Sequence, residues 1–274
     1  GAFTYTPTVF GAAASTDTIT VTIVDGYGGS TPVAVSVPIP AGLVSSAKVT
    51  YSFNYTSGAQ LWTPAAKSAM QTAADTIASY IVVAQPVTLT FNVTATDSPD
   101  SSTLASTGSD LTGSGSGYFN TVVQNKLLEG IDSNGAAADG DIDVNFGNPW
   151  AYGDTVSGSQ YDFISTMMHE MMHAYGFLSY IDEAGYNTGR QWTIFDSVIT
   201  DQAGTPVIGS TYRFKTAFNP NLTGGNGGLY FSGANAVAAY GGPVPIYTPD
   251  PWEAGSSGSH LDDYTFTGAN AQLM

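Results

Sequence analysis

The sequence predicts an α+β fold: one domain whose N-terminal part carries the sheet and two main helices, and whose C-terminal part is irregular and loop-rich. Short segments in which polar and apolar side chains alternate, the pattern of strands, recur as far as residue 146. Two further segments place apolar side chains at helical spacing. Beyond Leu178 both patterns give way to stretches rich in glycine, asparagine and serine. The chain has 274 residues, which is enough to bury a sizeable core.

The strands are predicted where threonine alternates with valine, isoleucine or aromatic residues. They cover residues 18–24, 33–37, 48–55, 87–93 and 141–146. Residues 1–47 are expected to form a β-rich N-terminal element, either as an integral part of the sheet, which we favour, or as a small separate β-element. The stretch 97–117 is rich in serine, threonine, glycine and aspartate, and it predicts a long loop. Residues 193–199 predict a short helix or strand, and the glycine- and asparagine-rich stretch 219–228 predicts a mobile loop.

Two main helices and a shorter one, over residues 119–128, are predicted from apolar residues at helical spacing. The first main helix begins at Pro64, because proline is favoured in the first helical turn. The second runs from about residue 160 to 177. Ser159 is its expected N-cap, and Gly176 is expected to end it.

The composition limits the partners that this chain can take. Acidic residues outnumber basic ones by 22 to 6, and the formal net charge is −16. This balance argues against nucleic acid and anionic membranes as partners. No apolar run approaches the roughly 18 residues that a membrane span needs. Such an acidic surface either serves solubility or holds cations, above all calcium.

Cysteine is absent, which excludes disulfides, thiolate zinc sites and cysteine nucleophiles. The polar residues are mainly serine, threonine and asparagine rather than lysine and glutamate, a composition that favours a secreted, extracellular protein. We expect a monomer. No signal-peptide pattern stands at the first residues, so a leader is expected either to have been cleaved or to lie outside the given sequence.

The motif His169-Glu170-Met171-Met172-His173 lies in the second main helix. A spacing of four puts both imidazoles on one helical face, one turn apart, so that both reach one metal ion. Glu170 lies beside that face, where it can hold a water molecule and take its proton. The motif therefore predicts a zinc site with Glu170 as general base. The alternatives are a helix that carries these residues by chance and a site that binds zinc without catalysis.

Zinc in a catalytic site needs a third protein ligand and an open fourth position for water. The chain has 3 histidines, and the one outside the motif, His260, is the leading candidate for the third ligand. The alternative for His260 is an exposed histidine in a flexible loop. Carboxylates compete for the same role: Asp182, Glu183, Asp196 and Glu253.

The pattern His169-Glu170-x-x-His173-x-x-Gly176, followed by Phe177, resembles the active-site helix of the metzincin metallopeptidases. In the compact form of their motif a third histidine stands three residues after the glycine, where this chain has Ser179. The leishmanolysin-like branch instead takes that histidine from far downstream, ahead of a methionine turn. His260 and Met274 fit that layout, and the lack of cysteine makes the chain look more like bacterial secreted relatives.

The resemblance implies a metzincin-like fold, with a twisted mixed sheet and an irregular lower part, and the activity of a secreted zinc metalloendopeptidase. Residues 48–178 would form the upper part with the active-site helix, and residues 179–274 the lower part with the third ligand. The implied roles are zinc ligand for His169, His173 and His260, general base for Glu170, and turn methionine for Met274.

Other acidic residues suggest further roles. Asp139, Asp141, Asp143 and Asn145 alternate, so a strand would present them on one face. Their carboxylates repel one another unless they are solvated or hold a cation, so the face is either a solvated surface or a structural calcium site.

Three residues that follow the third histidine are candidates for supporting roles. Asp262 or Asp263 could orient His260, although surface acids in a loop are the simpler interpretation. Tyr264 is a candidate for oxyanion stabilisation.

Three functions stay open at this point. The first is a zinc endopeptidase whose polypeptide substrate adds to a strand above the active-site helix. The second is a non-catalytic extracellular surface or adhesion module on a metallopeptidase scaffold, which an intact Glu170 argues against. The third is a zinc enzyme with a non-protein substrate, which cleavage of casein rather than small esters would exclude.

Overall fold

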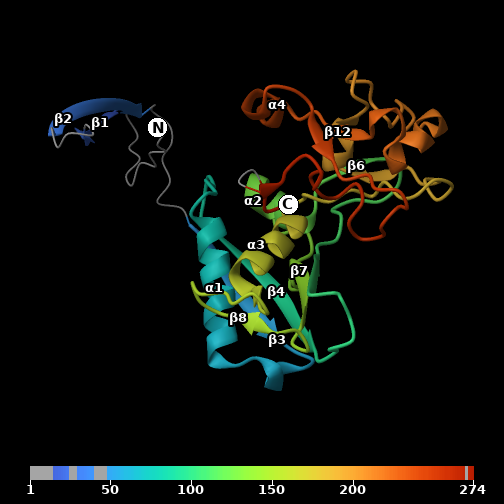
Figure 1. Ribbon diagram of the computed structural model, residues 1–274. Helices are drawn as coiled ribbons and strands as arrows, with labels where there is room; N and C mark the ends of the chain where they lie inside the picture. Colours follow the sequence, from blue (N-terminus) through green and yellow to red (C-terminus); the bar gives the residue numbers. More distant parts are fainter. Residues whose placement is uncertain (1–14, 25–29, 40–47, 269–270) are drawn as a thin grey trace.

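The computed structural model describes residues 15–24, 30–39, 48–268 and 271–274. Within them the chain forms a mixed α+β structure built on a twisted four-stranded sheet (Figure 1). The strand order is β3-β4-β7-β5. Strands β3, β4 and β7 are parallel, and β5, at one edge, is antiparallel to β7. These strands cover Val49–Tyr55 (β3), Val87–Thr96 (β4), Ala105–Gly108 (β5) and Gly140–Asn145 (β7).

Alternation along β4 separates the two faces of this sheet. Its apolar side chains, such as Leu89, Phe91 and Val93, are fully buried, whereas the threonines and the asparagine between them are partly exposed. The helices α1 (Pro64–Ala78) and α3 (Phe163–Ala174) pack against each other and share one core with the buried face (Figure 1). The burial of this apolar face gives α3 a rigid support.

The predicted start of α1 is confirmed. Thr63 caps the helix by accepting a hydrogen bond from the amide of Ala66 at 3.2 Å, and Pro64 takes the first helical position. The short helix predicted near residue 120 is α2 (Val122–Glu129), and its N-cap is Thr121. Thr121 and Gln124 form a reciprocal capping box.

The predicted start of the second main helix is wrong by a few residues. Residues 161–162 extend as a short strand that pairs with residues 150–151, so α3 cannot begin at residue 160. The N-cap is therefore Asp162 rather than Ser159, and its carboxylate accepts a hydrogen bond from the amide of Ile164 at 3.1 Å. The end near Gly176 is confirmed, since this glycine has a φ of 96° two residues after the helix.

The C-terminal part is irregular, as predicted, but it has a core of its own. Its largest fully buried side chains include Trp192, Leu222 and Leu229. The stretch predicted as a loop over residues 219–228 consists largely of 3-10 helix, and residues 193–199 combine a strand end with a 3-10 turn. The remaining elements are η1 (Ala59–Leu61), β6 (Gly117–Phe119), β8 (Trp150–Ala151), β9 (Tyr161–Asp162), β10 (Gln191–Thr193), η2 (Phe195–Val198), β11 (Ile199–Thr200), η3 (Thr216–Thr223), η4 (Gly225–Gly227), β12 (Leu229–Phe231), α4 (Ala234–Tyr240) and β13 (Val244–Ile246).

Two further expectations are wrong. The strands β1 (Ser15–Val24) and β2 (Ser30–Ile39) pair with each other in a separate two-stranded sheet, not with the main sheet. Neighbouring strands on a short connection satisfy their backbone groups locally, which explains the hairpin. The rest of the predicted element 1–47 lies outside the described residues. Strand β5 lies within the stretch 97–117 that was predicted as a loop. The strand is only partly buried, and its polar sequence Ala-Ser-Thr-Gly lacks the alternation that would have predicted it.

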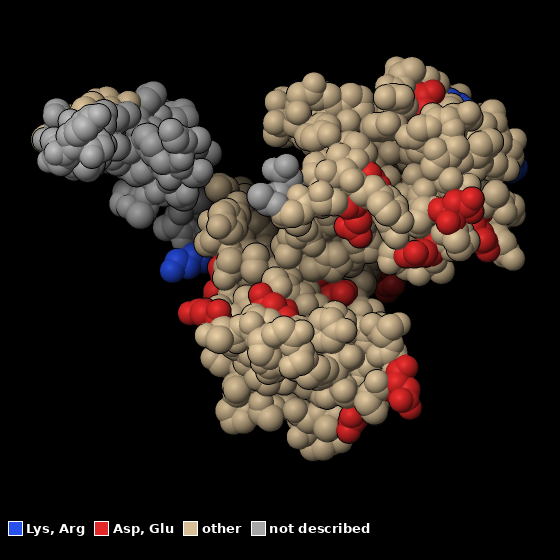
Figure 2. All heavy atoms as spheres, in the orientation of Figure 1, with Lys and Arg blue, Asp and Glu red and all other residues tan. Residues whose placement is uncertain are grey.

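Among the described residues, no helix combines the length and the apolar character that crossing a bilayer requires. Acidic side chains lie at scattered places on the face of the molecule that Figure 2 shows, rather than in one patch. This dispersion fits a role of the negative charge in solubility.

The hydroxyl of Thr121 joins two helices and gives a first prediction. It accepts from the amide of Gln124 at 3.0 Å and donates to the carbonyl of Ala174, at the end of α3, at 2.7 Å. Thr121→Ala should lower the free energy of unfolding by about 2 kcal/mol, because a buried carbonyl loses its donor together with the cap. Thr63→Ala, which removes a cap alone, should cost about 1 kcal/mol. Urea unfolding measures both; equal costs would contradict the role of the contact between α2 and α3.

Candidate metal centre

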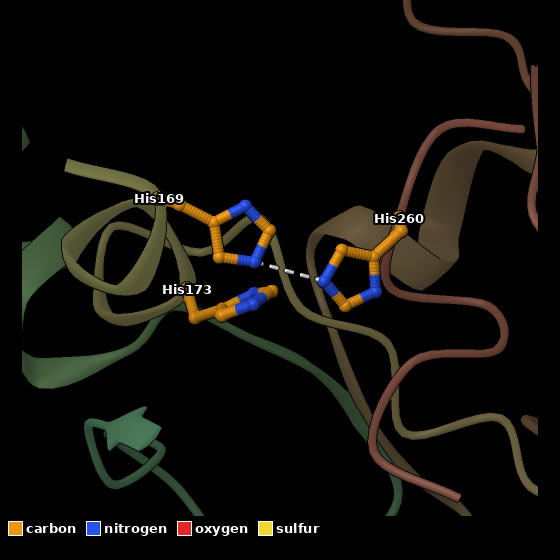
Figure 3. Close-up of side chains that lie close together, drawn as sticks. All are labelled: His169, His173 and His260. Atoms are coloured by element: carbon orange, nitrogen blue, oxygen red, sulfur yellow. Dashed lines mark hydrogen bonds between the residues drawn. The ribbon is translucent and has the colours of Figure 1, made fainter. Parts of the chain in front are cut away.

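Three histidines from two distant segments of the chain converge beside α3. His169 and His173 project from that helix one turn apart, and His260 arrives from the segment after β13 (Figure 3). Their ligand nitrogens all lie within 4.8 Å of one another. The Nε2 atoms of His169 and His260 are 3.0 Å apart. In the described part of the chain, no other histidine or carboxylate joins this group.

Each imidazole is oriented by a backbone carbonyl at its other nitrogen. The Nδ1 atoms of His173 and His260 lie 2.7 Å from the carbonyl oxygens of Phe177 and Ser256, respectively. The Nδ1 atom of His169 lies 2.5 Å from the carbonyl oxygen of Leu273. A carbonyl only accepts hydrogen bonds, so each Nδ1 carries the proton and each Nε2 presents a lone pair to the shared centre. Histidine ligands of metals are oriented by carbonyl partners in the same way.

Burial favours the neutral form of the two imidazoles on α3. It lowers the pKa of His173 to about 4, and it also lowers the pKa of His169. In the tautomers that place the proton on Nδ1, His169 and His260 have no hydrogen to share between their Nε2 atoms, although these atoms lie 3.0 Å apart. A divalent cation between the lone pairs removes this conflict. The three residues therefore fit a metal ion.

Glu170 lies beside the histidines without belonging to the ligand group. Its side chain is buried on α3 at the edge of the same cleft. Burial raises the pKa of its carboxyl to about 7, since the charged form loses solvation. A carboxyl of this kind accepts a proton at neutral pH and gives it up again.

The histidines open into a cleft of about 990 Å³. One wall is the segment 102–107, which includes most of β5, and the other wall is formed by residues 254–256 with Gln272 and Leu273. Glu170 is the only side chain in this lining, apart from the histidines, that can carry a charge. Among the described strands β5 pairs with β7 alone, so the cleft lies beside an edge of the sheet.

The competing carboxylates lie elsewhere. Asp196 is fully buried and accepts hydrogen bonds from Ser179 and two backbone amides. Asp182 and Glu183 are exposed, and the carboxylate of Glu253 accepts a hydrogen bond from Tyr247 at 3.1 Å. The structure thus brings His260 to the two histidines of the motif, and it brings none of these four carboxylates there.

The predicted supports of His260 are replaced by a backbone group. Its Nδ1 faces the carbonyl of Ser256 rather than Asp262 or Asp263. Tyr264 is 78% exposed and does not line the cleft. These backbone carbonyls could not be found from the sequence, because every residue carries one. The carbonyl of Leu273 brings the segment with Met274 to His169, and the role of Met274 stays a prediction.

The alternating acids do not form a shared cluster in the described part of the chain. Asp139 is buried, not solvated, and pairs with Lys126 at 3.0 Å. Asp141 accepts a hydrogen bond from the side chain of Asn92, and Asp143 accepts one from Thr94 at 2.6 Å. Each carboxylate therefore has a protein partner of its own, and calcium stays an untested prediction.

The metal-free chain should take up one zinc ion and gain thermal stability, because the ion binds the folded state. His260→Ala should weaken the binding by more than about 100-fold, since a first ligand contributes at least as much as its supports. Tyr264→Ala, an exposed neighbour, serves as control and should bind like the parent chain. Competition with a chelator measures all three affinities. Unchanged affinity in His260→Ala would exclude this residue as a ligand.

No protein-family model, curated protein or solved structure matches this chain.

Proposed function

We propose that this chain is a secreted zinc-dependent metalloendopeptidase with a leishmanolysin-like, metzincin type of active site. The observation that carries the proposal is the convergence of three Nε2 lone pairs beside Glu170 in an open cleft. Three histidines with an open fourth position are a ligand set of catalytic zinc sites. The position of Glu170, next to the first ligand, supports hydrolysis rather than a purely structural site.

Zinc bound in this way lowers the pKa of water towards neutrality and polarises a carbonyl oxygen. Glu170 supplies the proton transfers. Its carboxylate accepts a proton from the attacking water and delivers it to the leaving amine nitrogen, so that peptide-bond cleavage releases a neutral amine. The buried position of Glu170 helps, because a carboxyl with a raised pKa both takes and returns a proton near neutral pH.

The cleft supports an extended polypeptide as substrate. Strand β5 pairs with β7 on one side only and ends the sheet, and its residues line the cleft beside the histidines. A peptide can therefore add to the sheet through main-chain hydrogen bonds. Main-chain binding makes no demand on charge, in agreement with a lining that has no ionisable side chain besides Glu170 and the histidines.

Glu170→Gln tests the proposed chemistry. The amide keeps the shape of the side chain but cannot accept the proton, so kcat for casein cleavage should fall by about 100-fold or more. Zinc content should stay that of the parent chain, because Glu170 is not a ligand. Cleavage of casein at the parent rate, with zinc bound, would contradict the assignment of the base and favour a non-catalytic or different role.

Strand addition gives an independent prediction about the substrate. Backbone amides of a paired strand point alternately towards and away from its neighbour. Peptide substrates with one N-methylated amide should therefore lose kcat/KM by about tenfold at every second position only. A uniform effect along the peptide would contradict binding at the edge of β5.

A further inference from the structure

A buried carboxylate of the C-terminal part contacts the residues that follow α3. Asp196, in η2, is 1% exposed. Its Oδ1 accepts a hydrogen bond from the hydroxyl of Ser179 at 2.6 Å, and its Oδ2 accepts from the amides of Tyr180 and Thr193, each at 3.0 Å. Among the described residues, the ion pairs are those of Lys126 with Asp132 and Asp139, so Asp196 is in none of them. The three hydrogen-bond donors therefore compensate its buried charge.

These contacts fix the chain just after α3. The hydroxyl of Ser179 also accepts from the amide of Ile181 at 3.0 Å, and Thr193 donates to the carbonyl of Leu178 at 2.7 Å. Residues 178–181 are thus held against residues 193–196 by side chains from both segments. Burial raises the pKa of Asp196 to about 6, and its hydrogen bonds oppose that rise. Retaining a carboxylate at such a place points to a specific positional role.

The fixed segment in turn receives the loop that carries the third histidine. The amide of Ser179 donates to the hydroxyl of Ser259 at 3.0 Å, and Ser259 directly precedes His260. Gly258, with a φ of 78°, lies against the side chain of Ser179. Residues 257–259 are buried there. Ser179 stands where the compact metzincin motif has its third histidine, and the loop that carries His260 docks on this residue.

We propose that Asp196 is a positioning residue of the metal centre, which places the His260 imidazole through Ser179 and Ser259. Asp196 does not touch the metal or the substrate. It fixes Ser179, whose amide then sets the position of the loop 257–260 relative to α3. The inference rests on the proposed zinc site and adds the device that brings the third ligand to the helix.

The test compares two buried aspartates. Asp196→Asn keeps the shape but places an NH2 group, which cannot accept, against the hydroxyl that Ser179 donates, so it should raise the dissociation constant for zinc by about 10- to 100-fold. Asp139→Asn, which alters a buried carboxylate directly before β7 that pairs with Lys126, should leave that constant unchanged even if it lowers Tm. Zinc affinity is measured by chelator competition at a temperature at which circular dichroism shows each variant folded.

The visible absorption of the cobalt(II)-loaded chain gives a second readout, since it depends on the ligands and their geometry. It should change in Asp196→Asn and not in Asp139→Asn. Equal zinc affinities and equal cobalt spectra in the two variants would overturn the inference while the proposed function stands. A parent chain that binds no zinc would overturn both.

A milder pair of variants decides the question if Asp196→Asn does not fold. Ser259→Ala removes the hydroxyl that accepts from Ser179, and Ser257→Ala removes a hydroxyl in the same loop that accepts from the amide of Glu253 at 2.9 Å. Ser259→Ala should weaken zinc binding by about tenfold relative to Ser257→Ala. Equal affinities of these two variants would overturn the role of the docking contact.

Discussion

Three imidazole lone pairs held towards one point are the constraint on which the rest of this structure depends. Each Nδ1 is held by a carbonyl from a different segment, at Phe177, Ser256 and Leu273. In the tautomers that place the proton on Nδ1, the Nε2 lone pairs repel one another unless a cation lies between them. Metal binding, as proposed, would couple to folding: the segments that supply the carbonyls would have to be in place before an ion is held, and the ion would stabilise their arrangement.

The site also explains how the two parts of the molecule are connected. The core that includes Ala174 belongs to the sheet and its helices, whereas Ile181 belongs to the separate core of the C-terminal part. The cleft takes one wall from the segment with β5 and the other from residues 254–256, so it lies where the two parts meet. A metal ion held by two ligands from α3 and one from the C-terminal part would join them (Figure 3).

The features of the fold that the sequence predicts are those set by interactions between residues close together in the chain. Local patterns predicted β3, β4, β7 and the start of α1, because alternation and a proline after a threonine cap act within a few residues. The spacing of His169 and His173 predicted a shared helical face for the same reason. The scarcity of histidine predicts His260 as the third ligand, whereas nothing near it in the sequence identifies a ligand.

Interactions without a local signal were missed. The polar strand β5 is defined by its pairing with β7. The alternation in β1 and β2 predicts strands, but it does not say which strand each of them pairs with. Asp139 looked like a surface acid but pairs with Lys126 in a buried site. The orienting partners of the histidines are backbone carbonyls, which no residue type marks.

The most direct test of the central claim is a zinc titration of the metal-free chain followed by NMR of the imidazole nitrogens. One equivalent of zinc should shift the Nε2 resonances of His169, His173 and His260 together, while their Nδ1 atoms remain protonated. Shifts confined to His169 and His173, with His260 unperturbed, would contradict a single site built from three histidines.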